Sequence, residues 1–261
     1  MSSDKDLAKI EHALELARTV VGTFTSGRIR AELKTGGDPV TAADIELDRL
    51  LRETLVDADD GWLSEETADD LGRLKKRRVW IVDPLDGTRE FIEGIDQWCI
   101  SVALAVDGHV TAAGICNPAA DRLFLGSRRT GVTFNGRPVT TSNHSALAGA
   151  RILASRTEVG RGLWERFADS EFTVVPVGSV AYKLALVAAG LADATFTLVP
   201  KNEWDIAAGT FLVTAAGGKV SDTQGACLIF NRRQTRLKGL VAAGPRLFGP
   251  LTEMLGIEPQ P

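Results

Sequence analysis

The sequence predicts a protein of mixed α/β class, in which a helical first quarter precedes an antiparallel strand meander and an alternating second half. Three patterns support this class: apolar residues at helical spacing, short apolar runs between turn dipeptides, and a final alternation of strand-like and helix-like segments. With 261 residues, 44% of them hydrophobic, the chain is long enough for one large domain or two closely packed halves.

The first quarter carries two stretches with apolar residues at helical spacing, separated by the polar turn Gly36-Gly37-Asp38-Pro39. We therefore expect two amphipathic helices here. Their apolar positions are Leu7, Ile10, Leu14, Ala17, Val20 and Val21 in the first stretch, and Ile45, Leu47, Leu50, Leu51 and Leu55 in the second.

From Val79 to about Val139 the pattern changes to short apolar runs divided by turn dipeptides, which indicates a meander of mostly antiparallel strands. The polar stretch at residues 140–145 is the best boundary in the chain. It divides an N-terminal α+β half, residues 1–145, from a C-terminal α/β half, residues 146–261. The turn dipeptides are Asp107-Gly108, Asn117-Pro118 and Asn135-Gly136.

The second half alternates predicted strands with predicted helices. The strands are RILAS, FTVVPV, DATFTLV, KVSD, LIF and LKGLVAA. Helices are expected near Trp164, from Ser179 to Ala189, from Asn202 or Glu203 through Ala216, and near Leu247–Leu255. The pair Gly217-Gly218 ends the third of these helices.

Composition excludes several classes of function. The net charge of −4, from 34 acidic and 30 basic residues, provides no broad basic field for a nucleic-acid polymer. The three cysteines lie far apart without a CxxC pair, which argues against a zinc site. The N-terminus is interrupted by charges and no apolar run approaches ~18 residues, so we expect a cytoplasmic protein without a membrane partner.

The most informative segment is Val79–Thr88, in which a buried strand stops at Asp83, turns through Pro84 and carries a second carboxylate at Asp86. Two acids held this close repel each other unless a cation lies between them, and a hard cation such as Mg²⁺ suits oxygen ligands. The Leu85 carbonyl is a further candidate ligand. The Gly87 and Thr88 backbone N–H groups and the Thr88 hydroxyl could hold a phosphate against the metal.

Two alternatives compete with this interpretation. Asp83 could be a helix cap and Asp86-Gly87 an ordinary turn, although the full decamer favours the metal site. The haloacid-dehalogenase type of phosphatase has a DxDGT motif at a strand end with an aspartyl nucleophile. Here two residues separate the acids instead of one, which breaks that match.

Two further acidic segments flank this motif in the sequence. Glu65-Glu66 is either a solvated charge cluster or a metal-facing pair, and Asp205 in the first turn of a helix could simply complement the helix dipole. Taken together, the three separated acidic segments around one strand-end loop suggest a two- or three-metal phosphoryl-transfer site.

The sequence resembles the inositol monophosphatase-like superfamily of lithium-sensitive, Mg²⁺-dependent phosphatases, and the resemblance covers nearly the whole chain. It implies a layered αβαβα sandwich of the inositol monophosphatase and fructose-1,6-bisphosphatase type, with the active site between the two halves. The matching segments, in the order that the family uses, are Asp38–Asp44, Leu63–Glu66, Trp80–Thr88, Gly178-Ser179 and Glu203–Gly209.

The resemblance implies a role for each acidic position. Glu65, Asp83 and the Leu85 carbonyl would bind one Mg²⁺, and Asp83, Asp86 and Asp205 a second, with Mn²⁺ as a possible substitute. Glu65 with Thr88 would orient and deprotonate the attacking water, and no protein nucleophile is required. Asp44 would organise water near a third, weaker metal.

Substrate contacts are expected mainly from the second half, although each basic residue among them could equally be a solvated surface cation. Gly178 and Ser179 offer backbone and hydroxyl donors at a loop-to-helix junction, and a second phosphate would need a cation. The candidate contacts are Gly87, Thr88, Arg156, Gly178, Ser179, Lys183, Lys201, Asp205 and Arg232.

Softer features point to one branch of the superfamily. Asp86–Ile92, Ser64-Glu65-Glu66 and Gly178–Lys183 resemble 3′(2′),5′-bisphosphate nucleotidases, which implies hydrolysis of adenosine 3′,5′-bisphosphate to AMP and phosphate. Hydrolysis of inositol 1-phosphate or fructose 1,6-bisphosphate stays open, as does a non-catalytic, metal-dependent nucleotide-binding module. Glu65 and Thr88 are both present, which favours an enzyme. We expect a monomer or homodimer with a small phosphorylated substrate.

Overall fold

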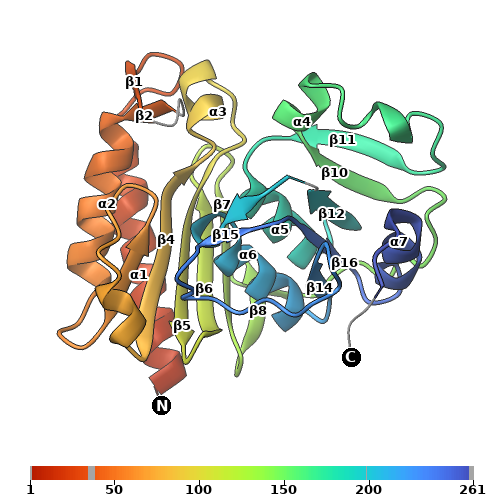
Figure 1. Cartoon of the computed structure of the whole chain (residues 1–261). Helices are drawn as coiled ribbons and strands as arrows, with labels where there is room; N and C mark the ends of the chain where they lie inside the picture. The colour runs from red at the N-terminus through yellow and green to blue at the C-terminus, as the bar shows by residue number, and fades with distance from the viewer. Residues whose placement is uncertain (1, 35–38, 198, 259–261) are drawn as a thin grey trace.

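The computed structural model describes residues 2–34, 39–197 and 199–258. Helices and sheets alternate in five layers (Figure 1). This arrangement confirms the predicted layered αβαβα sandwich. The predicted turn Gly36-Gly37-Asp38 lies outside the described residues. No helix in the described ranges is long and apolar enough to cross a membrane.

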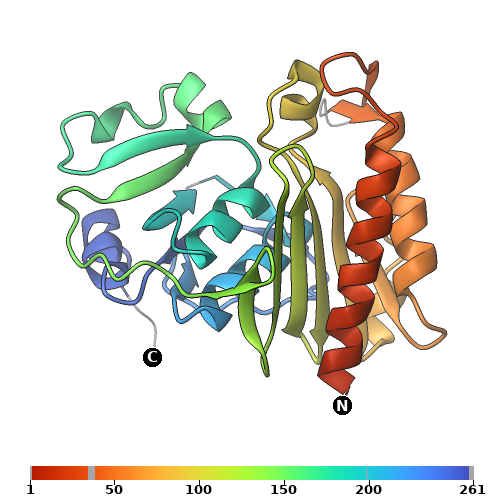
Figure 2. The same ribbon diagram turned by 180° about the vertical axis from the view of Figure 1, so that it is seen from behind.

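The first layer consists of α1 (Ser2–Val21) and α2 (Ala42–Leu55), which lie along the outer face of a seven-stranded sheet (Figure 2). Most of the predicted apolar positions are buried, including Ile10 and Leu47, whereas Ile45 is exposed and Leu7, Val20 and Leu50 are half-buried. A capping box starts α2, in which the Thr41 backbone N–H donates to Asp44 over 2.8 Å. The helical prediction for the first quarter is therefore confirmed for both stretches.

The seven-stranded sheet follows the chain in order, from β3 to β9. Strands β3 and β4 pair in parallel and all later neighbours pair antiparallel, which confirms the predicted meander and adds β3, a strand that the sequence did not reveal. The strands are β3 (Gly61–Ser64), β4 (Arg78–Asp86), β5 (Cys99–Val106), β6 (His109–Asn117), β7 (Arg122–Ser127), β8 (Gly131–Phe134) and β9 (Arg137–Val139).

The middle layer holds α5 (Val180–Ala188) and α6 (Glu203–Ala215), packed between the two sheets. Every residue of α5 is buried, as a helix covered on both faces requires. The two helices approach closely at Gly209, where a Cβ atom would lie 2.4 Å from the Cβ of Leu184. The small residue at Gly209 therefore lets α6 pack directly against α5.

The second sheet has the strand order β11-β10-β12-β16-β14 and is covered on its outer side by α7 (Phe248–Leu255) and a 3₁₀ turn at Glu165–Phe167. The helix predicted near Trp164 is thus only this short turn. The predicted strand LIF is a loop, because the Phe230 N–H donates to the Gly108 carbonyl instead of to a strand. The strands are β10 (Arg151–Ser155), β11 (Thr173–Val177), β12 (Ala194–Thr197), β14 (Lys219–Asp222) and β16 (Leu240–Ala243).

Short elements surround one end of the two sheets. Two of them, β13 (Lys201–Asn202) and β15 (Arg236–Leu237), form an antiparallel ribbon beside the start of α6. The others are β1 (Ala31–Leu33), β2 (Pro39–Thr41), α3 (Thr88–Glu93) and α4 (Arg156–Gly160). This end of the molecule carries the candidate site.

Candidate active site

Asp83 lies at the carboxyl end of β4 and is 1% exposed. Strand β4 is buried along almost its whole length, so the strand carries this carboxylate into the interior. The Leu85 backbone N–H donates to Asp83 Oδ1 over 3.0 Å, which fixes the carboxylate at the turn. A buried carboxylate with one backbone donor is electrostatically under-compensated.

Asp86 ends the same strand and joins it to α5. Its Oδ2 atom accepts hydrogen bonds from Ser179 Oγ over 2.7 Å and from the Ala181 backbone N–H over 2.6 Å. Ser179 has a φ of 56°, in the left-handed region that non-glycine residues seldom adopt. Gly178, before it, has no room for a side chain, because a Cβ atom would lie 2.5 Å from Glu90.

Three carboxylates meet in front of the β4 turn. Ligand atoms of Glu65, Asp83 and Asp205 all lie within 4.8 Å of one another. Glu65 follows β3, which runs parallel to β4 and therefore ends at the same edge of the sheet. Asp205 is in the first turn of α6, where its Oδ2 accepts from the Asn202 N–H over 2.9 Å. These residues come from three separate segments, as the sequence predicts.

The carboxylates raise one another's pKa values. Burial raises the pKa of Asp83 well above its usual range, and repulsion from Glu65, Asp86 and Asp205 raises it further. Burial and the charge of Asp86 raise the pKa of Asp205 to about 7. A divalent cation would remove this repulsion, and carboxylate oxygens are the donors that hard divalent cations prefer. The donor set therefore fits a metal ion.

Lys34 supplies a positive charge at this cluster from the segment after β1. Its Nζ atom lies 2.7 Å from Glu65 Oε1 and 2.6 Å from Glu66 Oε1. Burial alone would lower the pKa of Lys34, but the two ion pairs raise it above its ordinary value. Lys34 therefore neutralises part of the acidic cluster when no divalent cation is present.

Thr88, the first residue of α3, lies between the β4 turn and α2. Its Oγ1 atom is 3.0 Å from Asp44 Oδ1 and 3.1 Å from the Leu85 carbonyl oxygen. A hydroxyl has one hydrogen, so Thr88 can donate to only one of these acceptors at a time. Burial raises the pKa of Asp44, although hydrogen bonds from Thr41 and Thr88 oppose this shift. Gly87, with a φ of 101°, makes the turn before Thr88.

The cluster opens into a cavity of about 620 Å³ between the seven-stranded sheet, α5 and the β13–β15 ribbon. Most of the predicted site residues line it: Glu65, Asp83, Leu85, Asp86, Gly87, Thr88, Gly178, Ser179, Lys183, Lys201 and Asp205. The structure does not bring Arg156 or Arg232 into this cavity. Arg156 lies 3.7 Å from Glu93, and the Arg232 N–H donates to Glu203 over 2.9 Å.

Lys183 is a buried lysine in the wall of this cavity. Burial and repulsion from Lys201 lower the pKa of Lys183 to about 8. Its Nζ atom donates to the Ser179 carbonyl oxygen over 3.0 Å. An ammonium group with few compensating partners is a suitable contact for an anionic ligand.

Six charged residues of the site are absent from the sequence prediction: Lys34, Arg89, Glu90, Glu158, Arg161 and Arg236. Lys34 directly precedes the predicted Gly-Gly turn, and a cation beside a turn near acidic motifs could have marked it. Arg161 and Arg236 line the same cavity as Lys183. Glu158 lies in the wall and accepts from Trp164 Nε1 over 3.0 Å. No local pattern distinguishes the last three from surface charges.

A cavity that combines clustered carboxylates with basic side chains, at one end of a layered α/β sandwich, defines a site for phosphate esters bound together with cations. The sequence profile of the inositol monophosphatase family matches residues 4–254. The chain belongs to this family. It is therefore a phosphoric monoester hydrolase of a generally metal-dependent family, rather than a binding module alone.

Several relatives and solved structures resemble the chain over most of its length. An inositol-1-monophosphatase of Rhizobium meliloti is 36% identical over 206 residues, covering 76% of this chain and 77% of its own. A fructose-1,6-bisphosphatase/inositol-1-monophosphatase of Thermotoga maritima is 32% identical, covering 76% of this chain and 78% of its own. The crystal structure of extragenic suppressor protein suhB from Bartonella henselae has a TM-score of 0.78 at 29% identity, covering 95% and 97% of the two chains.

Proposed function

We propose that this chain hydrolyses the 3′-phosphate of adenosine 3′,5′-bisphosphate to give AMP and phosphate, with Mg²⁺ ions held at the carboxylate cluster. One observation carries this proposal: the cavity contains more positive charge than one phosphate requires. Besides the metal-binding carboxylates, it is lined by five basic residues and two further acids: Arg89, Arg161, Lys183, Lys201 and Arg236, and Glu90 and Glu158. The basic side chains therefore outnumber the acids that have no metal-binding role.

Glu65, Asp83, Asp86 and Asp205, with the Leu85 carbonyl, are the groups that would hold the metal ions. When bound, the ions would neutralise phosphate oxygens, lower the pKa of water and stabilise the leaving oxygen. Glu65, together with Thr88, would orient and deprotonate the attacking water. Asp44 fixes Thr88 through the 3.0 Å hydrogen bond, which makes Asp44 a positioning residue in this proposal.

The second phosphate would be bound at the β13–β15 ribbon. Pairing of Asn202 with Arg236 in this ribbon brings Arg236 next to Lys201 at one wall of the cavity. Arg161 approaches from the end of α4, and both arginines have exposed side chains. At this wall of the cavity, Arg161, Lys201 and Arg236 would contact the phosphate group that does not react.

Inositol 1-phosphate is the second candidate substrate. Two relatives favour this substrate, because both are named inositol-1-monophosphatase. They come from Rhizobium meliloti and Mesorhizobium japonicum and are 36% and 34% identical to this chain. This substrate has one phosphate and several hydroxyl groups, so it would leave Arg161 and Arg236 without an anionic partner.

The test compares phosphate release from adenosine 3′,5′-bisphosphate, inositol 1-phosphate and fructose 1,6-bisphosphate under the same conditions. Arg236→Ala and Lys201→Ala should weaken binding of the bisphosphate nucleotide by ~1.5–3 kcal/mol, or roughly 10- to 100-fold, and change inositol 1-phosphate hydrolysis much less. Arg232→Ala, outside the cavity, is the matched control. A wild-type preference for inositol 1-phosphate would refute the nucleotidase assignment and leave the family membership intact.

The metal part of the proposal is tested separately. Activity should require Mg²⁺ or Mn²⁺, disappear in excess chelator and fall in millimolar lithium, as the sequence resemblance implies. Full activity in chelator would contradict the assignment of the carboxylate cluster as a metal site. Retained activity in lithium would contradict only the lithium sensitivity.

A further inference from the structure

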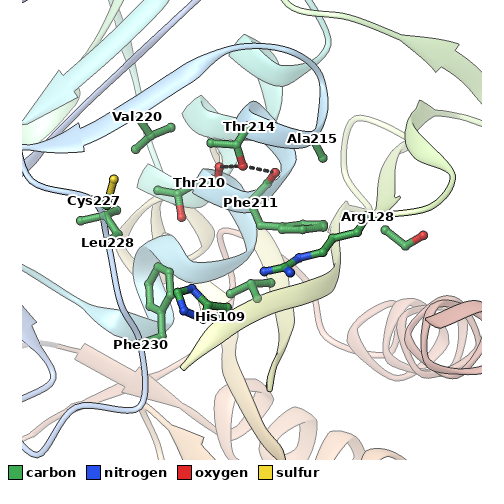
Figure 3. A pocket seen from close by; sticks show the side chains of 12 residues that line it. His109, Arg128, Thr210, Phe211, Thr214, Ala215, Val220, Cys227, Leu228 and Phe230 are labelled. Carbon is green, nitrogen blue, oxygen red and sulfur yellow. Dashed lines mark hydrogen bonds between the residues drawn. The ribbon is translucent and has the colours of Figure 1, made fainter. Parts of the chain in front are cut away.

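A second pocket lies at the opposite end of α6 from the carboxylate cluster (Figure 3). Its volume is about 540 Å³, within the range of small-molecule sites. Asp205 starts α6, whereas Thr214 and Ala215 near its end line this pocket. Ten residues of helix separate Asp205 from Ala215, which corresponds to roughly 15 Å. A substrate at the carboxylate cluster therefore does not fill this pocket.

The walls of the pocket are held in place by the fold. Phe211 comes from α6, Val110 from β6 and Val220 from β14. The loop that carries Leu228 and Phe230 is fixed to the β5–β6 turn, because the Phe230 N–H donates to the Gly108 carbonyl over 2.9 Å. These five side chains make one side of the pocket apolar. A pre-formed apolar wall favours a ligand with a compact hydrophobic body.

The charge at the pocket is positive. Figure 3 shows the side chains of Arg128, in the turn after β7, and of His109, the first residue of β6, in the pocket. None of the described residues that line it is acidic. Within the described part of the chain, the Arg128 guanidinium has no hydrogen-bond or ion-pair partner, whereas the neighbouring Arg129 pairs with Asp4 over 2.8 Å. Arg128 is therefore available to an anion.

The hydroxyl groups in the pocket do not compete with Arg128 as donors. Thr214 Oγ1 lies within hydrogen-bond distance of the carbonyl oxygens of Thr210 and Phe211, as the dashed lines in Figure 3 show, and donates its one hydrogen to either of them. Thr210 Oγ1 donates to the Ile206 carbonyl oxygen over 2.9 Å. Their hydrogens are used within α6. The third hydroxyl in the lining, Ser127 Oγ, shares a hydrogen bond with Thr130 Oγ1 over 2.9 Å. Arg128 and His109 are therefore the main side-chain donors for an anionic group.

We propose that this pocket binds a small amphipathic anion, whose apolar body lies against Phe211 and Phe230 and whose carboxylate or phosphate group pairs with Arg128. The ligand is distinct from the substrate and its binding does not depend on the metal ions. The proposal is independent of which phosphate ester the enzyme hydrolyses.

Cys227 provides a direct readout, because it lines the pocket and is exposed, whereas Cys99 and Cys116 are buried. The rate of Cys227 alkylation by N-ethylmaleimide is measured on the full chain with three probes: 3-phenylpropionate, 2-phenylethylphosphonate and the neutral 3-phenylpropanamide. An anionic probe at about four times its Kd should slow alkylation about fivefold, and the amide should not. Which anion protects better distinguishes a carboxylate ligand from a phosphate ligand.

Arg128→Ala should abolish this protection, while Arg129→Ala, at an exposed neighbouring position outside the pocket, should keep it. Circular dichroism of both variants establishes that the fold is retained. The proposal is overturned by any of three results: no protection by either anion at millimolar concentration, equal protection by the amide, or unchanged protection in Arg128→Ala.

Discussion

Ser179 Oγ donates a 2.7 Å hydrogen bond to Asp86 Oδ2, so the first turn of α5 holds the carboxylate at the end of β4. The Ala181 N–H donates to the same oxygen, and Ser179 Oγ also accepts from the Tyr182 N–H over 3.0 Å. The Ser179 hydroxyl thus caps α5 and also orients Asp86 at the edge of the seven-stranded sheet. The two halves of the site are connected through this contact.

Ser179→Ala should therefore affect both stability and catalysis. Loss of the cap and of the hydrogen bond to Asp86 should lower the free energy of unfolding by about 1–2 kcal/mol. A displaced Asp86 should lower kcat/KM roughly 10- to 100-fold. Thermal unfolding and phosphate release measure the two effects. Ser170→Ala is the control, because its hydroxyl donates to Phe167 far from the cavity and should leave kcat/KM unchanged. Wild-type kcat/KM in Ser179→Ala would disprove the link.

The helices of the first quarter and the strand meander could be predicted from local sequence, whereas the layered sandwich and the roles of the acidic residues were implied by the family resemblance. Strand β4 and its turn place Asp83 and Asp86 wherever the strand ends, and the first turn of α6 places Asp205. Strand and helix geometry predicts where each acid lies on its own element, but not that the three segments meet. The strand β3 was missed, since four residues carry too little periodicity for a prediction.

The basic residues could not be predicted in the same way. Arg156 and Arg161 lie at the two ends of α4, and only the second lines the cavity. Arg232 and Arg236 occur in one basic stretch, and pairing of β15 with β13 directs only Arg236 to the site. Which arginine reaches the substrate depends on long-range register, and a single sequence contains no signal for that register.

Asp83→Asn should have opposite effects on stability and activity. Because burial and three neighbouring acids disfavour the charged form of Asp83, its replacement should stabilise the metal-free protein by roughly 1–3 kcal/mol. The variant should gain little stability from added Mg²⁺, whereas the wild type should gain much more. Thermal unfolding in chelator and in Mg²⁺ measures both effects.

The same variant should lose activity by roughly two to three orders of magnitude, since the predicted role of Asp83 serves two cations. Asp222→Asn is a suitable control, because that side chain closes a turn at Gln224 and Ala226 outside the cavity. Equal Mg²⁺ stabilisation of Asp83→Asn and the wild type would contradict the assignment.

Lys34 and a divalent cation should compete for Glu65. Lys34 Nζ already lies 2.7 Å from Glu65 Oε1. Glu65 must therefore break this ion pair before that oxygen can bind a metal ion. Lys34→Ala should therefore lower the Mg²⁺ concentration required for half-maximal thermal stabilisation, and should destabilise the metal-free protein. Lys9→Ala removes an ion pair with Asp57 far from the site. This variant should not change the Mg²⁺ concentration required for half-maximal thermal stabilisation. An unchanged midpoint in Lys34→Ala would show that Lys34 does not occupy the metal position.

Substrate binding should weaken as the pH rises through about 8, where Lys183 loses its proton. Burial and the charge of Lys201 lower the pKa of Lys183 to about 8, so the lysine is cationic below this pH and neutral above it. A phosphate monoester has its second pKa near ~6 and stays a dianion over this range, so the substrate charge does not change. With saturating Mg²⁺, KM should therefore rise between pH 7 and pH 9.

Two variants separate Lys183 from other titrating groups. Lys183→Gln should have a raised KM already at pH 7 and a flat profile up to pH 9, where the wild type approaches it. Lys201→Gln removes the repulsion that lowers the pKa of Lys183, so its rise in KM should shift to higher pH. Steady-state KM values measured at closely spaced pH points establish both profiles. If Lys183→Gln kept the wild-type pH dependence, Lys183 would not be the titrating group, because the variant has no ionisable group at that position.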